Sequence, residues 1–253
     1  MIKLEGNLND NYVSCDESVS LTGIVDGIDN KIIISKFNSK ANISIKIHGN
    51  NNIVFIDASD YLVSSLKINI GNFSHANNVK VLIGKNFQCN QAVFYMDNPK
   101  TDLVIGDYCM FSNSISIRVG ELAHMIFDKN SKQYVDITEG VYIGEHVWVC
   151  EGVYITKKVT IPNNCIVAAN AVVTKRFSNP FSVLAGNPAR EVKTGIQWVK
   201  NRGFCMKYNS DLFKSFEDYY TQAMKYTSEK IDRVEDFIEV QRQYIKNKNS
   251  GRS

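Results

Sequence analysis

Aliphatic residues recur at intervals of six over a long central stretch of the chain. The unbroken series consists of Ile143, Val149, Ile155, Ile161, Val167 and Val173. A second series lies two positions earlier and contains only small or β-branched residues: Val141, Val147, Val153, Val159, Cys165 and Ala171. Helices repeat at about 3.6 residues and alternating strands at about two, so neither explains this spacing.

A period of six with two inward positions predicts short strands joined by bends. Three such units close one triangular coil, and stacked coils bury a continuous interior that no single coil could bury alone. The same double register appears earlier in the chain, in the pairs Leu103 and Ile105, Cys109 and Phe111, and Ile115 and Ile117. A weaker run comprises Val81 and Ile83, Phe87 and Cys89, and Val93 and Tyr95. We therefore predict an all-β solenoid.

The spacing also locates two insertions in the solenoid. Ile117 and Ile143 are 26 residues apart, which predicts a loop of about 20 residues within 118–140. When this loop is left out, three stacks are expected: Ile105, Ile143 and Ile161; Phe111, Val149 and Val167; and Ile117, Ile155 and Val173. A shorter insertion is expected at Met96–Thr101. Long loops on regular scaffolds are often functional.

The pattern weakens towards both ends of the chain. Upstream segments such as residues 43–51 and 66–71 fit looser coils that reach back to about residue 20. After Val192, helical spacing over residues 211–226 and 230–246 predicts two amphipathic helices that pack on the solenoid end or on another subunit. We expect a β-helix domain over residues 1–195 with its loop insertion at 118–140, and a C-terminal α-helical extension over 196–253.

Composition limits the possible partners. The 253 residues carry a net charge of +3, which gives no reason to expect nucleic acid. The first residues lack the apolar core of a signal peptide, and no stretch is long and apolar enough for a transmembrane segment, so we expect a cytoplasmic protein. The six cysteines form no CxxC pair, and we expect reduced core residues rather than disulfides.

One stretch of the solenoid resembles a known family. Residues 141–175 read VYIGEHVWVCEGVYITKKVTIPNNCIVAANAVVTK, and VLAGNPAREVK follows at 183–193. These blocks resemble the hexapeptide-repeat acyltransferases, which include galactoside, serine and maltose O-acetyltransferases, and above all the bacterial enzymes that O-acetylate sialic acids and capsular polysaccharides. The resemblance implies a left-handed parallel β-helix, a homotrimer with active sites between subunits, and acetyl-CoA as the acetyl donor.

The long insertion contains a candidate general base. His124 lies in the segment ISIRVGELAHMIFD, and an imidazole titrates in the range needed to take a proton from an attacking hydroxyl. The family commonly has an aspartate two residues before its catalytic histidine, whereas this chain has Leu122 there and Glu121 one step earlier. Either Glu121 or a backbone carbonyl is expected to orient the ring.

The resemblance also suggests a cofactor path. Trp148 lies between two inward valines, so its ring should point outward, where the family places a tryptophan beside the catalytic histidine and the thioester. A large aromatic on a solenoid wall needs a ligand or a partner subunit to cover it. The remaining candidates for acetyl-CoA binding are Ala168 and Ala169 for the pantetheine arm, Thr174 and Lys175 from the family pattern, and Arg190 and Lys193 for the phosphates.

The function predicted from these residues is O-acetylation of a sugar hydroxyl, on a capsular or other cell-surface polysaccharide. An N-acetyltransferase acting on an amino sugar is an alternative on the same fold, as is a catalytically silent assembly protein. A zinc enzyme of the γ-carbonic-anhydrase type would need three converging histidines. Only His124 and His146 lie in the relevant region, so no metal is expected.

Overall fold

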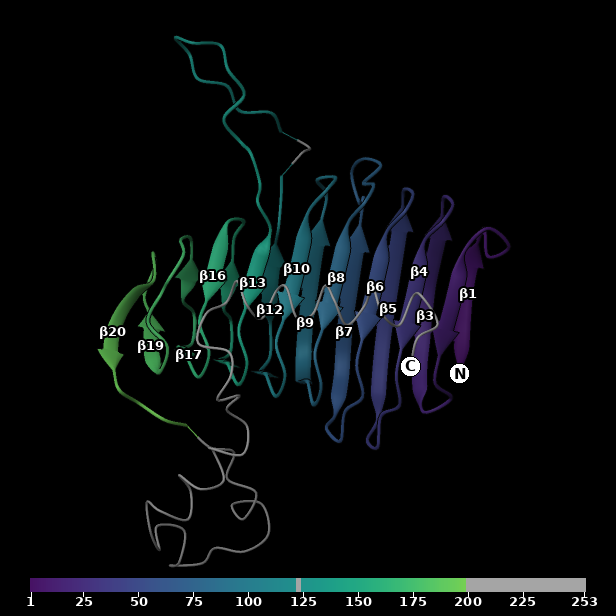
Figure 1. Ribbon diagram of the computed structural model, residues 1–253, viewed down its shortest axis with the longest axis horizontal. Coiled ribbons are helices and arrows are strands. Elements are labelled where there is room, and N and C mark those ends of the chain that lie inside the picture. The colour runs from purple at the N-terminus through teal and green to yellow at the C-terminus, as the bar shows by residue number, and fades with distance from the viewer. Residues whose placement is uncertain (122–123, 199–253) are drawn as a thin grey trace, which may run out of the picture.

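The computed structural model describes residues 1–121 and 124–198, which wind into a parallel β-solenoid (Figure 1). The predicted helices at 211–226 and 230–246, and the extension to residue 253, lie outside the described residues. Within the described part, no helix is long and apolar enough to cross a bilayer.

Two sheets make up the solenoid. One is a 7-stranded sheet with the bounds β2 (Tyr12–Cys15), β4 (Lys31–Ile34), β6 (Ile53–Ile56), β8 (Lys80–Ile83), β10 (Asp102–Ile105), β13 (Val141–Ile143) and β16 (Val159–Ile161). The other is a 13-stranded sheet with the bounds β1 (Ile2–Gly6), β3 (Val19–Asp26), β5 (Ala41–His48), β7 (Val63–Ile70), β9 (Gln88–Met96), β11 (Met110–Phe111), β12 (Ile115–Arg118), β14 (Trp148–Val149), β15 (Tyr154–Ile155), β17 (Ile166–Val167), β18 (Val172–Val173), β19 (Ser182–Ala185) and β20 (Arg190–Thr194). Neighbouring strands pair in parallel, except that β20 runs antiparallel to β19.

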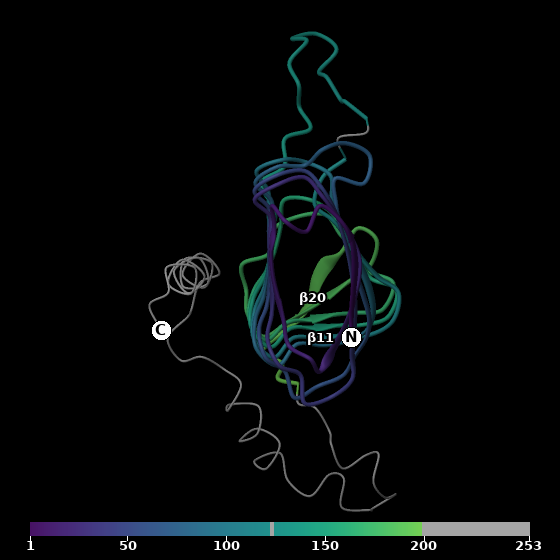
Figure 2. The same cartoon turned by 90° about the vertical axis from the view of Figure 1, so that its right-hand side faces the viewer.

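The N-terminal coils have a different shape from the C-terminal ones. Their long strands pair at steps that vary from 19 to 26 residues, with 22 between Val19 and Ala41. Each coil has two main faces, which gives the elongated outline seen along the solenoid axis (Figure 2). Pairing begins with β1 at Ile2, so the start near residue 20 expected from the sequence was wrong. Because these coils lack the three-unit geometry, the period of six does not reveal them.

Strand β9 marks the change from two faces to three. Its first residues pair with β11 and its later residues with β12, so one flat face divides into two. The expected inward positions Val93 and Tyr95 were wrong: they point outward, and Ala92 and Phe94 are buried instead. The bend within β9 adds one residue between inward positions, and this shifts the alternation.

The C-terminal coils follow the predicted register. Ile105 pairs with Ile143 and Ile143 with Ile161, and the other two predicted stacks pair in the same way. All six residues of each inward series between 141 and 173 are fully buried. Continuous burial of aliphatic side chains is therefore the main stabilising contribution in this half of the solenoid.

The corners between strands use close backbone contacts and polar side chains. A Cβ atom on Gly106 would lie 2.6 Å from the carbonyl carbon of Gly144 in the next coil, so only glycine fits there. In the earlier coils Asn30 and Asn52 form a buried ladder, in which the Asn30 Oδ1 accepts hydrogen bonds from the Asn52 backbone and side-chain amides. These contacts satisfy backbone groups that the turns leave without strand partners.

Truncation of a stacked aliphatic side chain should destabilise the solenoid strongly. Ile143→Ala removes buried volume between two neighbouring coils, and we expect a loss of about 2–5 kcal/mol in the free energy of unfolding. Denaturant titration at a fixed protein concentration measures it. Val192→Ala, at a side chain that is 61% exposed, is the control and should change stability little. Equal effects of the two variants would contradict the stacked-core description.

Candidate active site

The long insertion forms an arm that projects from one corner of the solenoid (Figures 1 and 2). This arm, residues 119–140, connects β12 to β13, and Phe127 and Tyr134 face each other across it in an antiparallel bridge. Several apolar side chains on the arm are 49–62% exposed: Met125, Ile126, Phe127, Val135 and Ile137. An apolar patch of this kind on a projecting segment is typical of an interaction surface.

Two ion pairs join the base of the arm to the solenoid, one with a buried carboxylate and one exposed to solvent. The buried carboxylate of Asp136 pairs with Lys157 of the next coil, and Glu139 pairs with Arg176 one coil further on. Burial lowers the pKa of the Lys157 ammonium, while the nearby charge of Glu121 acts in the opposite direction. The base of the arm is therefore held in place although its tip lies in solvent.

The short insertion packs against the same base. The Nη1 atom of Arg118 lies 3.5 Å from the carboxylate of Asp97, and the guanidinium lies 4.5 Å from the ring centroid of Tyr95. The side chain of Asn98 fills the space above Gly120, where a Cβ atom would lie 2.0 Å from the Asn98 Oδ1. The two insertions inferred from the repeat spacing thus meet at one corner.

His124 lies in the arm just beyond its base, and its side chain is exposed. Its backbone N–H donates to the carbonyl of Glu121 at 2.9 Å, which places the two residues on one turn. In the described part of the chain, no hydrogen bond joins the Glu121 carboxylate to the His124 imidazole. The charge of Glu121 acts instead on Lys157, whose pKa it raises. Glu121 as the orienting partner of His124 stays a prediction.

Trp148 points outward from β14, as its position between buried Val147 and Val149 predicts. Its neighbours in the ladder are Met110 on one side and Ile166 on the other. Although the residue is only half-buried, its indole Nε1 is shielded from solvent and has no hydrogen-bond acceptor among the described residues. A buried donor without a partner is unfavourable and therefore marks a position of interest.

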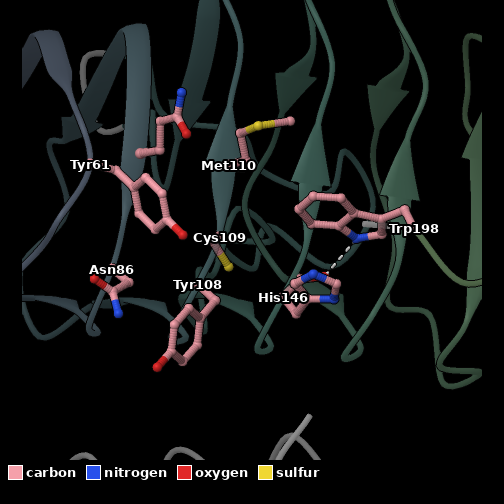
Figure 3. Close-up of a pocket in the computed structure, with 8 residues that line it drawn as sticks. Tyr61, Asn86, Tyr108, Cys109, Met110, His146 and Trp198 are labelled. Atoms are coloured by element: carbon pink, nitrogen blue, oxygen red, sulfur yellow. Dashed lines mark hydrogen bonds between the residues drawn. The ribbon is translucent and has the colours of Figure 1, made fainter. Parts of the chain in front are cut away.

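The side chain that covers Trp148 comes from the same chain. The Trp198 ring lies 5.9 Å from the Trp148 ring, centroid to centroid, and stacks on the His146 ring at 4.0 Å with nearly parallel planes (Figure 3). The Trp198 Nε1 donates to the His146 carbonyl at 2.9 Å. A small, open pocket lies beside the Trp198 and His146 rings and includes Tyr61, Tyr108 and Met110 in its lining.

His146 lies in the turn before the inward Val147, yet it is not a surface residue. It is 2% exposed, and its Nδ1 lies 3.0 Å from the Oδ1 of Asn164 in the next coil. Burial lowers the pKa of this imidazole to about 4, because the charged form loses its hydration. His146 therefore stays neutral near pH 7 and packs as an aromatic ring.

The remaining cofactor candidates fall into two groups. Arg190 and Lys193 are exposed on β20, at the end of the sheet that contains Trp148. One ladder row runs from Trp148 through Ile166 and Val183 to Lys193. This row places an aromatic ring, two aliphatic side chains and a cation in line along the outer face.

The second group lies at other corners of the coil. Ala168 and Ala169 form the bend between β17 and β18, but the Ala168 amide already donates to the Leu184 carbonyl at 2.8 Å. Thr174 and Lys175 follow β18, at the corner from which the arm emerges, and the Lys175 Nζ lies 5.1 Å above the Phe177 ring. Within the described chain, no contact joins Trp148 to His124 or to Lys175.

Residues one coil apart supply the contacts that the sequence did not predict. His146 and Asn164 differ by 18 residues, as do Glu145 and Asn163, whose backbone N–H and side-chain Oδ1 form a hydrogen bond. Eighteen is also the step between paired positions such as Val141 and Val159. This offset identifies which corner residues are neighbours, although not which of them form bonds. Trp198 had no such signal, because it lies beyond the repeats.

Three of the five described cysteines lie in the core and provide no accessible nucleophile. Cys89, Cys109 and Cys165 are buried and free, and burial raises the pKa of the Cys89 and Cys165 thiols to about 12. A thiol with so high a pKa is almost entirely protonated at neutral pH and is a poor nucleophile. No group of three or more potential metal ligands occurs in residues 1–121 and 124–198.

The fold is a parallel β-solenoid interrupted by one long corner loop, and this is the class of protein that the fold defines. The chain is similar to a polysialic acid O-acetyltransferase, OatWY, with a TM-score of 0.67 and 25% identity over 87% of this chain and 100% of that one. It shares its fold with the polySia-specific acetyltransferase NeuO, with a TM-score of 0.66 and 23% identity over 79% of this chain and 84% of that one.

A relative that is similar in sequence is also an O-acetyltransferase. The galactoside O-acetyltransferase of Escherichia coli (strain K12) is 31% identical over 122 residues, which are 48% of this chain and 56% of the relative. The match therefore spans little more than half of that enzyme. No family model matches the chain. The resemblance to hexapeptide-repeat acyltransferases inferred from the sequence is confirmed by the similar structures and by this relative.

Acidification should destabilise the protein through His146. Its folded-state pKa, about 4, lies below the ordinary value of 6.5, so the unfolded chain binds the proton more readily. Stability from this group is fully present above pH 6.5 and declines as the pH falls towards 4, by up to about 3 kcal/mol. Urea titrations between pH 7 and pH 4 measure it. His146→Gln, which does not titrate, should lose less stability over the same range, and an identical decline would contradict this role.

Loss of the Asp136–Lys157 pair should loosen the arm without unfolding the solenoid. Asp136→Asn removes the charge that neutralises Lys157, and we expect cleavage within residues 119–140 by a low protease concentration to become severalfold faster. Mass spectrometry of the fragments measures the site and the rate. Glu139→Gln is the matched control, because its pair with Arg176 is exposed and contributes little. Similar cleavage of both variants and the wild type would contradict the ion pair as the anchor.

Proposed function

We propose that the protein is an O-acetyltransferase that moves an acetyl group from acetyl-CoA to a hydroxyl of a sugar. The observation that carries this proposal is the similarity to OatWY over that enzyme's whole chain, combined with a corner loop that contains a histidine. The galactoside O-acetyltransferase relative supports the same chemistry. The similar structures include two enzymes named for polysialic acid, so we propose a cell-surface polysaccharide such as a capsule polymer as the acceptor.

His124 is the proposed general base. Its exposed imidazole at the corner of the arm takes the proton from the sugar hydroxyl as the oxygen attacks the thioester carbonyl. The base of the arm, fixed by Asp136 and Lys157, limits the positions that the ring samples. The carbonyl oxygen gains negative charge during attack, and a nearby N–H donor stabilises it. Collapse of the tetrahedral intermediate breaks the C–S bond, and the protonated imidazole gives its proton to the departing CoA sulfur. Transfer is direct, because the described cysteines are buried or lie away from the arm.

The Trp148 row is the proposed path of acetyl-CoA. The thioester end lies at Trp148, the pantetheine arm follows the aliphatic side chains of Ile166 and Val183, and Lys193 and Arg190 meet the phosphates. Three strand spacings separate Trp148 from Lys193, which is roughly 15 Å. Ala169, Thr174 and Lys175 lie on other sides of the coil, so they contact the donor only from a neighbouring copy.

A homotrimer accounts for this division of the site. His124 and Trp148 lie at different positions around one coil, and no contact joins them within the described chain. In a three-fold assembly, the arm of one subunit reaches the Trp148 row of the next, and the exposed apolar residues of the arm are covered. We further propose the left-handed winding of the hexapeptide family, a cytoplasmic location and no resident metal.

Replacement of the proposed base tests the mechanism. His124→Ala should lower acetyl transfer by a factor of about 10²–10⁴ while acetyl-CoA still binds, because the row that holds the donor is unchanged. Thiol release from acetyl-CoA in the presence of polysialic acid and other capsule polymers measures transfer, and calorimetry measures binding. Loss of the product acetyl group on mild base treatment identifies an ester and excludes N-acetylation. Full activity of His124→Ala would contradict the assignment.

A milder substitution tests the orienting residue. Glu121→Gln keeps the turn to the His124 backbone but removes the carboxylate charge. If Glu121 holds the imidazole in the working enzyme, kcat should fall about tenfold and the pH at half-maximal kcat should move to lower values, because the imidazolium loses a stabilising charge. Glu139→Gln at the other end of the arm is the control. An unchanged pH profile would leave a backbone carbonyl as the orienting group.

A further inference from the structure

Trp148 and Trp198 are the only two tryptophans in the chain, and they lie against each other. The planes of the two rings are inclined at 47°, and the Trp198 residue is 7% exposed. Trp198 therefore covers part of the outward-facing Trp148 ring, and it rests on the His146 ring (Figure 3). The inference drawn from this pair rests on the proposed acetyl-CoA path along the Trp148 row.

The covered indole of Trp148 has a hydrogen-bond donor that is not used within the described residues. The Trp148 Nε1 is shielded from solvent and lacks an acceptor in the described part of the chain. The Trp198 Nε1, in contrast, is satisfied by the His146 carbonyl. A donor removed from water without an acceptor is unfavourable in the empty protein, and a ligand carbonyl that reaches it gains a full hydrogen bond. The unpaired Trp148 N–H therefore favours a state in which a hydrogen-bond acceptor of the ligand replaces the Trp198 ring.

The covering residue is attached through a short strap, defined as residues 195–198, that follows β20. Gly195 has a φ of +65°, and a Cβ atom there would meet nothing within 4 Å, so the strap starts at an unobstructed glycine. The backbone hydrogen bond from Ile196 to the Phe181 carbonyl and the Trp198 bond to His146 hold it. Rotation at Gly195 would lift the ring and would break these two hydrogen bonds and the stacking on His146.

We propose that Trp198 is a positioning residue that covers the Trp148 indole in the empty enzyme and gives way to the acyl end of acetyl-CoA. The Trp148 N–H then donates to the thioester carbonyl oxygen. Because Trp198 has kept water away from this donor, no bound water must be removed when the carbonyl arrives. His146, neutral and fixed by Asn164, supplies the surface on which the Trp198 ring rests in the covered state.

Circular dichroism of the unmodified protein tests the movement directly. Two indoles at this separation couple and give an exciton couplet, which is absent when only one indole is present. We expect the couplet in the free protein, its loss on saturation with acetyl-CoA, and its absence in Trp198→Phe with or without ligand. A couplet that persists in the acetyl-CoA complex overturns the proposal.

Kinetics of Trp198→Ala test the consequence for catalysis. Without a ring to displace, the KM for acetyl-CoA should fall about fivefold, the equivalent of one aromatic pair. The kcat should fall about tenfold, because the Trp148 N–H becomes hydrated and less fixed. A purely structural role would raise KM or leave both constants unchanged, and either result overturns the proposal. Tyr12→Phe, at an exposed ring in the N-terminal coils, is the control.

Failure of this inference is separable from failure of the proposed function. If the wild-type protein neither binds acetyl-CoA nor transfers its acetyl group, the proposed function is wrong and this inference falls with it. If the wild-type protein is active but its couplet survives acetyl-CoA, only the role of Trp198 is wrong. If Trp198→Ala does not fold, as judged by its thermal transition, its kinetics are not used. The loss or persistence of the wild-type couplet on acetyl-CoA binding then decides whether Trp198 moves.

Discussion

Each coil of this protein must present the same inward side chains as the coil before it. Ile105, Ile143 and Ile161 occupy one position in three successive coils, and every one is fully buried. A slip of one residue would turn this row towards solvent, so register is strongly specified. All extra residues are therefore confined to the corners. The arm and the short insertion both lie at such corners, and the candidate chemistry depends on this restriction.

The arm combines a fixed base with an exposed, apolar outer part. Asp136 and Lys157 join its base to the next coil, whereas Met125 and Phe127 lie in solvent. This combination suits a segment that completes its contacts on another subunit. The proposed donor path lies on a different face, in the row from Trp148 to Lys193. The separation of the base from the donor path within one chain gives the proposed trimer a catalytic rather than a merely structural role.

The tryptophan cluster shows how burial determines the role of a polar group. His146 stacks against Trp198, and burial lowers the pKa of its imidazole to about 4, so the ring serves as a neutral packing surface. Trp148 lies two residues further on, and its N–H is withheld from water without an acceptor. His146 in the turn before β14 and Trp148 in β14 thus have different functions, one as support and the other as the donor expected to meet the ligand.

The sequence by itself determined the C-terminal coils, because an inward position every six residues has no other geometric explanation. It also located both insertions and the outward direction of Trp148, since these follow from counting along a fixed period. Only the tertiary structure revealed the wide N-terminal coils, whose long strands pair at steps that vary from 19 to 26 residues and so leave no short repeat. It alone revealed the Asp136–Lys157 pair, the burial of His146 and the Trp198 cover. These contacts join residues in different coils or beyond the repeats, where local sequence carries no information about which side chains meet.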